Sequence, residues 1–523
     1  MKRVSPAALK AAISDRAELA ILDAREEGEF GTAHLFWASP LPLSRLPLIA
    51  RALVPNPAAR VVVTDDGRGL AERAARELAA LGYSDVAVLD GGTPAWDAAG
   101  YVLFSGVNVP SKAFGEWVEH HYGTESIDAA DLKALADRGE RMVILDSRPL
   151  DEFRRMSIPG GINVPGGELA YRIGSLVPDP DTLVVVNCAG RTRSILGAES
   201  LRSAGIPNRV LALRNGTMGW ELAGFACARG ETARYPEGTP PDLDTALARA
   251  EALRVKHKVG LVDRETVDAW AADGTRTLYL LDVRDPAEFA ESHIPGSRSA
   301  PGGQLVQATD GWIAVRNARI VLVDDTGVRA RMAAQWLAQM GHRDIHVLEG
   351  GLVAPLVTGP WVPDVALPEV EALPLRAVHA ALAAGQGRVV DLARSIAFRD
   401  GHIPGSLWGV RTRLDALAAR LPETGLVAVT SPDDNRTASL AVEELADLTA
   451  ARVGVLEGGV AVWAAAGLPL AADRTNPPDE ACIDAYLRPY DRNSGVEAAM
   501  VAYLSWEIDL VKEIARDGDA PFG

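Results

Sequence analysis

One cysteine in this chain lies where a thiol could act as a nucleophile. Cys188 follows a run of β-branched residues and precedes a glycine-containing turn and a helix-like segment, residues 195–203. A strand, a turn and a helix in this order bring several backbone N–H groups to one point. Arg191 and Arg193 add two positive charges, which favour the thiolate and attract anions. The stretch therefore predicts a reactive cysteine in an anion-binding loop.

The residues after the cysteine are the predicted substrate-binding part of this loop. They are Ala189, Gly190, Arg191, Thr192, Arg193 and Ser194. We expect replacement of Arg191 or Arg193 to weaken donor binding more than folding, because a guanidinium at a loop tip contributes charge rather than core packing. The alternative interpretation is a buried structural cysteine, which has no need of flanking arginines.

The composition limits the partners and the compartment. A chain of 523 residues is too long for one hydrophobic core, and its length suggests about three to five domains. A net charge of −17 repels nucleic acids and anionic membranes, so an anion site has to be local. Three cysteines without a C-x-x-C pair predict neither a disulfide framework nor a metal site, and we expect no cofactor. No apolar stretch approaches about 20 residues, and the sequence predicts a cytoplasmic protein.

One unit is repeated four times along the chain. Each copy has an apolar strand that ends in aspartate, a turn, a second apolar strand, an alanine-rich helix and a third strand. The first-strand aspartates are Asp23, Asp146, Asp282 and Asp391. Strands that alternate with helices predict an α/β fold with a central parallel sheet flanked by helices, whose functional crevice lies at the carboxyl ends of the strands. Cys188 lies at one such end.

These units resemble the rhodanese family of sulfurtransferases. The resemblance rests on an Asp-x-Arg…Glu-Phe…His-Ile-Pro-Gly pattern, most complete at residues 282–296, on the six-residue loop 188–193, and on the Gly-Gly…Trp segment at residues 91–96. It implies a small α/β domain and chemistry through a cysteine persulfide on the loop. The chain is therefore interpreted as four tandem rhodanese-like domains and a helical tail: residues 1–105, 124–230, 259–360, 369–475 and 476–523.

Only the second unit carries the cysteine. Counting along the repeats places Asp65, Asp325 and Ser431 at its position in the other three units. A carboxylate or a hydroxyl offers no thiolate nucleophile, so these three units are predicted to be inactive in sulfur transfer.

The resemblance implies transfer of a sulfane sulfur from thiosulfate, a small anionic donor, to cyanide or a thiol through a Cys188 persulfide. Two arginines in the loop favour a compact, doubly charged donor. Mercaptopyruvate as the donor, a persulfide carrier and a binding scaffold stay open as alternatives. A phosphatase of related fold needs five residues between the cysteine and the arginine that ends the loop. Here only four separate Cys188 from Arg193, so phosphatase activity is not expected.

Three further features carry predictions. Asp146, Arg148 and Glu152 recur in the inactive units, which favours a structural ion-pair network. Glu168 and Arg172 are candidates for the mouth of the site. In the tail, residues 494–497 resemble a capping box, and apolar residues from Met500 to Ile514 recur at helical spacing, which predicts a helix docked on one of the domains.

Overall fold

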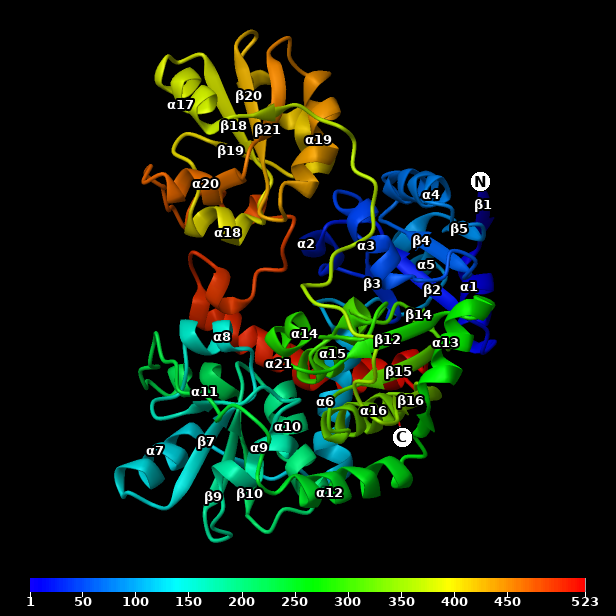
Figure 1. Cartoon of the computed structure of the whole chain (residues 1–523), viewed down its shortest axis with the longest axis vertical. Coiled ribbons are helices and arrows are strands. Elements are labelled where there is room, and N and C mark those ends of the chain that lie inside the picture. Colours follow the sequence, from blue (N-terminus) through cyan, green and yellow to red (C-terminus); the bar gives the residue numbers. More distant parts are fainter. Residues whose placement is uncertain (523) are drawn as a thin grey trace.

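The predicted apolar strands form four separate sheets with one strand order. The computed structural model describes residues 1–522. In each unit the strand that ends in aspartate and the strand that precedes the Cys188 position lie side by side and parallel. The α/β fold of four tandem units is thus confirmed (Figure 1).

The first half of the chain holds two units joined by a helix. Unit 1 contains β1 (Lys2–Val4), α1 (Pro6–Ser14), β2 (Leu19–Asp23), α2 (Glu27–Phe30), β3 (Ala38–Pro40), α3 (Leu46–Leu53), β4 (Val61–Thr64), α4 (Leu70–Ala80), β5 (Val86–Leu89) and α5 (Gly92–Ala98). The connecting helix is α6 (Val109–Tyr122). Unit 2 contains β6 (Ser126–Ile127), α7 (Ala129–Asp137), β7 (Met142–Asp146), α8 (Leu150–Arg155), β8 (Ile162–Asn163), α9 (Leu169–Leu176), β9 (Leu183–Asn187), α10 (Thr192–Ser203), β10 (Val210–Leu213) and α11 (Gly216–Leu222).

The second half follows α12 (Leu243–Lys256). Unit 3 contains β11 (Gly260–Val262), α13 (Arg264–Asp273), β12 (Leu278–Asp282), α14 (Pro286–Glu291), β13 (Arg298–Ser299), α15 (Gly302–Gln307), η1 (Thr309–Gly311), β14 (Val315–Arg316), β15 (Arg319–Val323), α16 (Val328–Gln339) and β16 (Asp344–Leu348). Unit 4 contains β17 (Ala372–Leu373), α17 (Leu375–Ala383), β18 (Gly387–Asp391), α18 (Ser395–Asp400), β19 (Leu407–Trp408), η2 (Arg411–Arg420), β20 (Leu426–Thr430), α19 (Arg436–Ala446), β21 (Arg452–Leu456) and α20 (Gly459–Ala465).

The central strand β9 shows why the second unit folds as predicted. Its residues point alternately to the two faces of the sheet, as the pleat requires. Val184 and Val186 pack in one core cluster with Leu201, whereas Val185 packs in another with Trp220. Because helices cover both faces, the strand is apolar from Leu183 to Val186, and its last residue, Asn187, leads into the polar loop.

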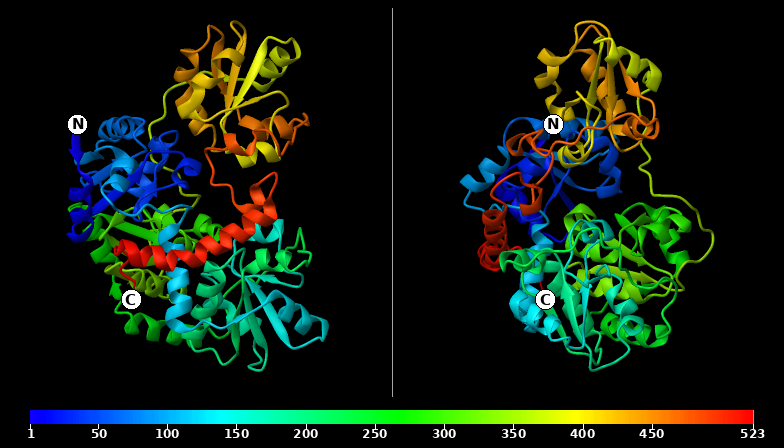
Figure 2. Two further views of the ribbon diagram at one scale, coloured as in Figure 1. Left: turned by 180° about the vertical axis from the view of Figure 1, so that it is seen from behind. Right: turned by 90° about the vertical axis from the view of Figure 1, so that its left-hand side faces the viewer.

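Units 1, 2 and 3 pack closely, and unit 4 lies at one end of the molecule (Figures 1 and 2). Strand β14 of unit 3 pairs antiparallel with β2 of unit 1 and extends its sheet. Units 2 and 3 meet at two glycines that have no room for a side chain, because a Cβ on Gly167 would lie 2.9 Å from the backbone nitrogen of Gly303. Between residues 1 and 522, no helix is long and apolar enough to cross a bilayer.

The tail returns across the first three units (Figure 2). It contains η3 (Asp479–Ala481), η4 (Pro489–Asp491) and α21 (Val496–Asp517), which packs against α6. The predicted docked helix is therefore confirmed. The predicted capping box is wrong, because Gly495 occupies the cap with a φ of 65° and no side chain accepts a hydrogen bond there. Ile508, one of the apolar residues at helical spacing, is 45 % exposed, while Glu507 is buried.

Candidate functional site

Cys188 lies at the carboxyl end of β9, at the floor of a cavity of about 600 Å³. The residue is 1 % exposed. Its Sγ donates a hydrogen bond to Ser194 Oγ at 3.5 Å, and the Ser194 hydroxyl donates to the carbonyl of Arg191 at 2.8 Å. The hydroxyl therefore positions the sulfur above the first turn of α10.

The backbone N–H groups of residues 189–194, in the loop that follows Cys188, have no partners of their own. In the part of the chain that the structure describes, none of them donates to a protein acceptor. They belong to the loop and to the first turn of α10, where the helix leaves its N–H groups unsatisfied. An anion placed here would satisfy them, so the arrangement is an open anion-binding loop.

The corresponding loop of unit 1 is filled by its own side chain. The Asp65 carboxylate accepts hydrogen bonds from the backbone N–H groups of Gly67 at 2.9 Å, Leu70 at 2.7 Å and Ala71 at 3.2 Å. A carboxylate at the cysteine position thus occupies the place that an anionic ligand needs.

In unit 3 the residue at the cysteine position is Asp324, and the predicted assignment to Asp325 is wrong. Strand register decides this, because Asp282 pairs with Val323 just as Asp146 pairs with Asn187. The start of the following helix agrees, since Gly327 caps α16 three residues after Asp324. Asp324 accepts from the N–H groups of Gly327 at 2.8 Å and Arg329 at 3.0 Å, so this loop is also filled.

In unit 4, Ser431 accepts from the N–H of Ala438 at 3.0 Å and donates to Asp433. Strand register places Ser431 one residue beyond the pairing of Asp391 with Thr430, which is the Cys188 position, as predicted.

Arg191 does not lie at a loop tip. Its guanidinium is buried and pairs with Glu116 of α6 at 2.7 Å, and it also contacts Glu119. Burial lowers the pKa of Arg191, but Glu116, Glu119 and Glu507 together raise it by more, so the net pKa shift is upward. The expectation that Arg191 contributes charge rather than core is therefore wrong, because Arg191 ties the loop to the connecting helix.

Arg193 is held by Glu152, the glutamate of the Glu-Phe pair in the same unit. It forms hydrogen bonds of 2.9 and 2.8 Å to the two carboxylate oxygens of Glu152 on α8. Burial alone would raise the pKa of Glu152, but Arg193, Arg488 and Arg148 together outweigh it and lower the pKa to about 2. The predicted structural pair of Asp146 and Arg148 is confirmed at 2.7 Å, whereas Glu152 serves the loop instead.

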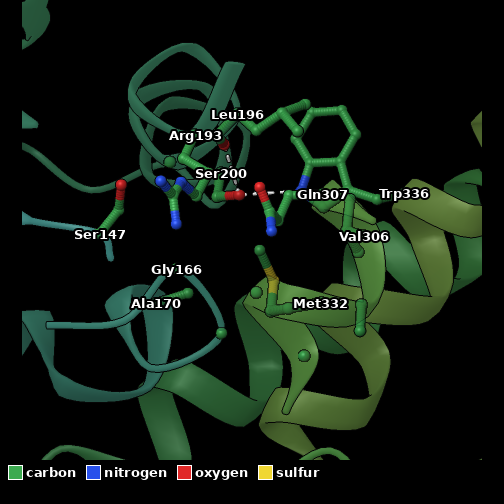
Figure 3. Close-up of a pocket in the computed structure, with 15 residues that line it drawn as sticks. Ser147, Gly166, Ala170, Arg193, Leu196, Ser200, Val306, Gln307, Met332 and Trp336 are labelled. Atoms are coloured by element: carbon green, nitrogen blue, oxygen red, sulfur yellow. Dashed lines mark hydrogen bonds between the residues drawn. The ribbon is translucent and has the colours of Figure 1, made fainter. Parts of the chain in front are cut away.

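The predicted place of Glu168 and Arg172 at the mouth is wrong. They pair with each other at 3.0 Å, and Glu168 also receives Arg329 of unit 3 at 2.8 Å, so both belong to the interface between units 2 and 3. A smaller cavity of about 40 Å³ lies at this interface. In Figure 3, Arg193 and Gln307 face it, and Trp336 donates to Ser200 at 2.8 Å.

The tail contributes residues to the site that no sequence motif predicted. Glu507 of α21 accepts from Lys112 Nζ at 3.0 Å and from Thr192 Oγ1 at 3.1 Å. A Cβ on Gly190 would lie 3.0 Å from a carboxylate oxygen of Glu507 and 3.2 Å from the ring of Tyr503. The tail therefore covers the cysteine loop from above. Across residues 1–522 there is no cluster of three His, Cys, Asp or Glu side chains that could hold a metal ion.

Asp310 of unit 3 is a buried carboxyl in the wall of the large cavity. Neither carboxylate oxygen has a hydrogen-bond partner among residues 1–522, and burial raises its pKa to about 7. A carboxyl whose pKa is higher in the folded state than in the unfolded state destabilises the fold as the pH rises from about 4 to 7.

We expect Asp310→Asn to raise the stability at pH 8 by about 2–4 kcal/mol and to leave it unchanged near pH 4. Chemical unfolding at the two pH values measures the difference. Equal effects at both pH values would contradict the assignment of a raised pKa to this carboxyl.

Comparison with known proteins places the repeats in one family. A sequence profile of the rhodanese-like domain matches residues 5–99, 128–223 and 263–354, together more than half of the chain. Unit 4 lies outside the matched residues, but its sheet has the same strand order as those of units 2 and 3.

One solved structure matches over the full length. The crystal structure of a thiosulfate sulfurtransferase from Pseudomonas aeruginosa is 44 % identical, covers 100 % of this chain and 99 % of its own, and has a TM-score of 0.92. The curated relatives match single units. The HTH-type transcriptional regulator Rv0324 of Mycobacterium tuberculosis is 34 % identical over 107 residues, 20 % of this chain, which spans 46 % of that protein's length. A sulfurtransferase of Allochromatium vinosum is 30 % identical over 96 residues, 18 % of this chain and 87 % of that protein.

Proposed function

Because this chain belongs to the rhodanese family of sulfurtransferases, we propose that it moves a sulfane sulfur from thiosulfate to cyanide or a thiol through a persulfide on Cys188. One observation supports this most directly: the N–H groups of residues 189–194 have no acceptor within the described chain. The equivalent loops of units 1 and 3 are closed by their own carboxylates.

In the first half-reaction, the Cys188 thiolate attacks the outer sulfur of thiosulfate. A new S–S bond forms, the bond between the two donor sulfurs breaks, and its electron pair leaves with sulfite. The backbone N–H groups of the loop stabilise the negative charge of the persulfide. In the second half-reaction, cyanide or a thiolate attacks the outer sulfur and Cys188 leaves as a thiolate. Such covalent shuttling predicts ping-pong kinetics.

The loop residues have different parts in this proposal. The backbone N–H groups of all six residues that follow Cys188 bind the anion. Arg193 contributes positive charge beside the sulfur and keeps the loop in shape through Glu152. Arg191 holds the loop against α6 and so affects donor binding only by fixing the position of the loop.

Intact-mass measurement after incubation with thiosulfate tests the proposal. We expect a gain of one sulfur atom that is removed again by cyanide, with thiocyanate as the product. Loading by mercaptopyruvate but not by thiosulfate would identify a different donor. No gain of sulfur from either compound would contradict a sulfurtransferase function.

A cysteine at position 65 should not restore activity to a Cys188→Ser protein. Asp65→Cys removes the carboxylate that accepts three hydrogen bonds in its own loop. This loop has one arginine instead of two, because only Arg68, which pairs with Glu29 at 2.7 Å and is 46 % exposed, is present. We expect thiocyanate formation at least about 100-fold below the parent rate, on the scale of a lost charge-stabilising arrangement. A rate near that of the parent would show that the surrounding loop matters less than the thiol.

A further inference from the structure

The cavity above Cys188 is much larger than thiosulfate or cyanide requires. Its volume of about 600 Å³ falls in the range of roughly 300–1,000 Å³ that suits drug-sized organic ligands. The walls come from every part of the molecule, with Pro40 from unit 1, Gln307 from unit 3, Ile396 from unit 4 and Tyr486 from the tail. Unit 4 and the tail thus take part in the site although neither has a reactive loop.

The cavity is cationic in a strongly acidic chain. Ten of its lining residues are lysine or arginine and six are aspartate or glutamate, whereas the chain as a whole has a net charge of −17. Such a local surplus attracts anions. Most of the buried lysines and arginines of the cavity are already paired, as Arg193 is with Glu152. Any unpaired positive charge must therefore belong to the exposed residues of the cavity.

Four exposed arginines line the cavity, and we name them the mouth arginines: Arg155, Arg229, Arg474 and Arg488. Arg155 pairs with Asp491 at 3.4 Å and Arg488 with Glu152 at 3.9 Å, so the unpaired charge is that of Arg229 and Arg474. Contacts between them place them together. Arg229 donates to the carbonyl of Arg155 at 3.3 Å, and Arg155 reaches Asp491 at 3.4 Å.

The other two come from beyond unit 2. The backbone N–H of Arg488 donates to the same Asp491 at 3.3 Å, and Arg474, at the end of unit 4, donates to the carbonyl of Tyr490 at 3.1 Å. Within residues 1–522, neither Arg229 nor Arg474 has a carboxylate within ion-pair distance. Guanidinium groups of this kind bind carboxylates through paired hydrogen bonds.

We propose that the sulfur acceptor is an organic thiol with one or more carboxylate groups, and that the mouth arginines bind those groups while the thiol reaches Cys188. This inference rests on the proposed function, because it concerns the second half-reaction. The thiolate of the acceptor attacks the outer sulfur of the Cys188 persulfide, the S–S bond to Cys188 breaks, and the acceptor leaves as a persulfide. Unit 4 and the tail then form the acceptor side of a site whose nucleophile belongs to unit 2.

Two features favour this small acceptor over a protein thiol or the donor. Cys188 is 1 % exposed, and Tyr503 and Glu507 pack against Gly190 of its loop, so a folded partner has no exposed cysteine surface to approach. Thiosulfate carries its charge on one compact group that the loop itself can bind, so it has no use for arginines at the mouth.

The test uses full-length protein that thiosulfate has already converted to the persulfide. Glutathione, a thiol with two carboxylates, and its diethyl ester, which lacks free carboxylates, serve as acceptors. The loss of one sulfur atom is followed by intact mass in single turnover. The parent is compared with Arg229→Gln, Arg474→Gln and the double variant, and Arg138→Gln is the matched control because Arg138 is exposed in unit 2 and does not line the cavity.

We expect the parent to react about 10-fold faster with glutathione than with the ester, each single variant to reduce this preference about 3-fold, and the double variant to abolish most of it. Arg138→Gln should keep the parent preference. Added salt should reduce the preference in the parent more than in the double variant.

Three results would overturn the inference. A parent without preference for the carboxylate-bearing thiol, or variants that keep it, would overturn the inference alone. Variants that slow thiosulfate loading by as much as glutathione transfer would show general steering of anions instead of acceptor binding. A parent that gains no sulfur from thiosulfate would overturn the proposed function as well.

Discussion

Cys188→Ser should lower thiosulfate-dependent thiocyanate formation by at least about 1,000-fold and abolish the gain of one sulfur atom in intact-mass spectra. A serine hydroxyl at this position has neither the acidity nor the soft nucleophilicity of a thiolate. The N–H groups of the loop would remain in place. The loss therefore isolates the contribution of the sulfur from that of the anion-binding loop.

The other two cysteines provide matched controls. Burial raises the pKa of Cys227 to about 12, and Cys482 is buried and contacts the carbonyl of Pro478 at 3.4 Å. We expect Cys227→Ser and Cys482→Ser to keep most of the activity, and transfer that persists in Cys188→Ser but disappears in one of them would relocate the site.

Arg191→Ala should destabilise the protein by about 3–5 kcal/mol, because it leaves a fully buried carboxylate without its partner. Glu116 is 0 % exposed, and Arg191 supplies its ion pair. Thermal and urea unfolding of the full chain measure the loss. Activity should fall as well, since the loop loses its attachment to α6.

The pH dependence of this loss distinguishes a buried charge from lost packing. Burial raises the pKa of Glu116 and Arg191 opposes that shift, so removal of Arg191 raises the pKa further. A carboxyl with a raised pKa in the folded state costs stability as the pH rises through that value. The loss in Arg191→Ala should therefore be larger at pH 8 than at pH 5, and Glu116→Gln in the same chain should recover part of it.

Arg209→Ala is the exposed control. Arg209 pairs with Glu125 at 3.0 Å, but 70 % and 54 % of the two side chains are exposed. Its removal should cost about 0–1 kcal/mol. A loss in Arg191→Ala no larger than this would contradict the structural role assigned to the Arg191 and Glu116 pair.

The sequence alone determined the four-unit α/β architecture and the position of the single loop cysteine. Both depend on local order: apolar strands, turns and helices recur along the chain, and a residue that follows a buried strand must lie at the edge of the sheet. The same pattern correctly indicated that the other three units lack a thiol. It misplaced one of them by a residue, because only the pairing of β12 with β15 shows that Asp324 follows the strand end.

Only the tertiary structure decided how the loop is held and covered. Arg191 meets Glu116 from 75 residues away, and Thr192 meets Glu507 from 315 residues away. No periodicity or spacing in the sequence reports such contacts, since they arise from the packing of α6 and α21 across the units. A guanidinium next to a cysteine can bind a ligand or a buried carboxylate, and the choice depends on which helix lies against it.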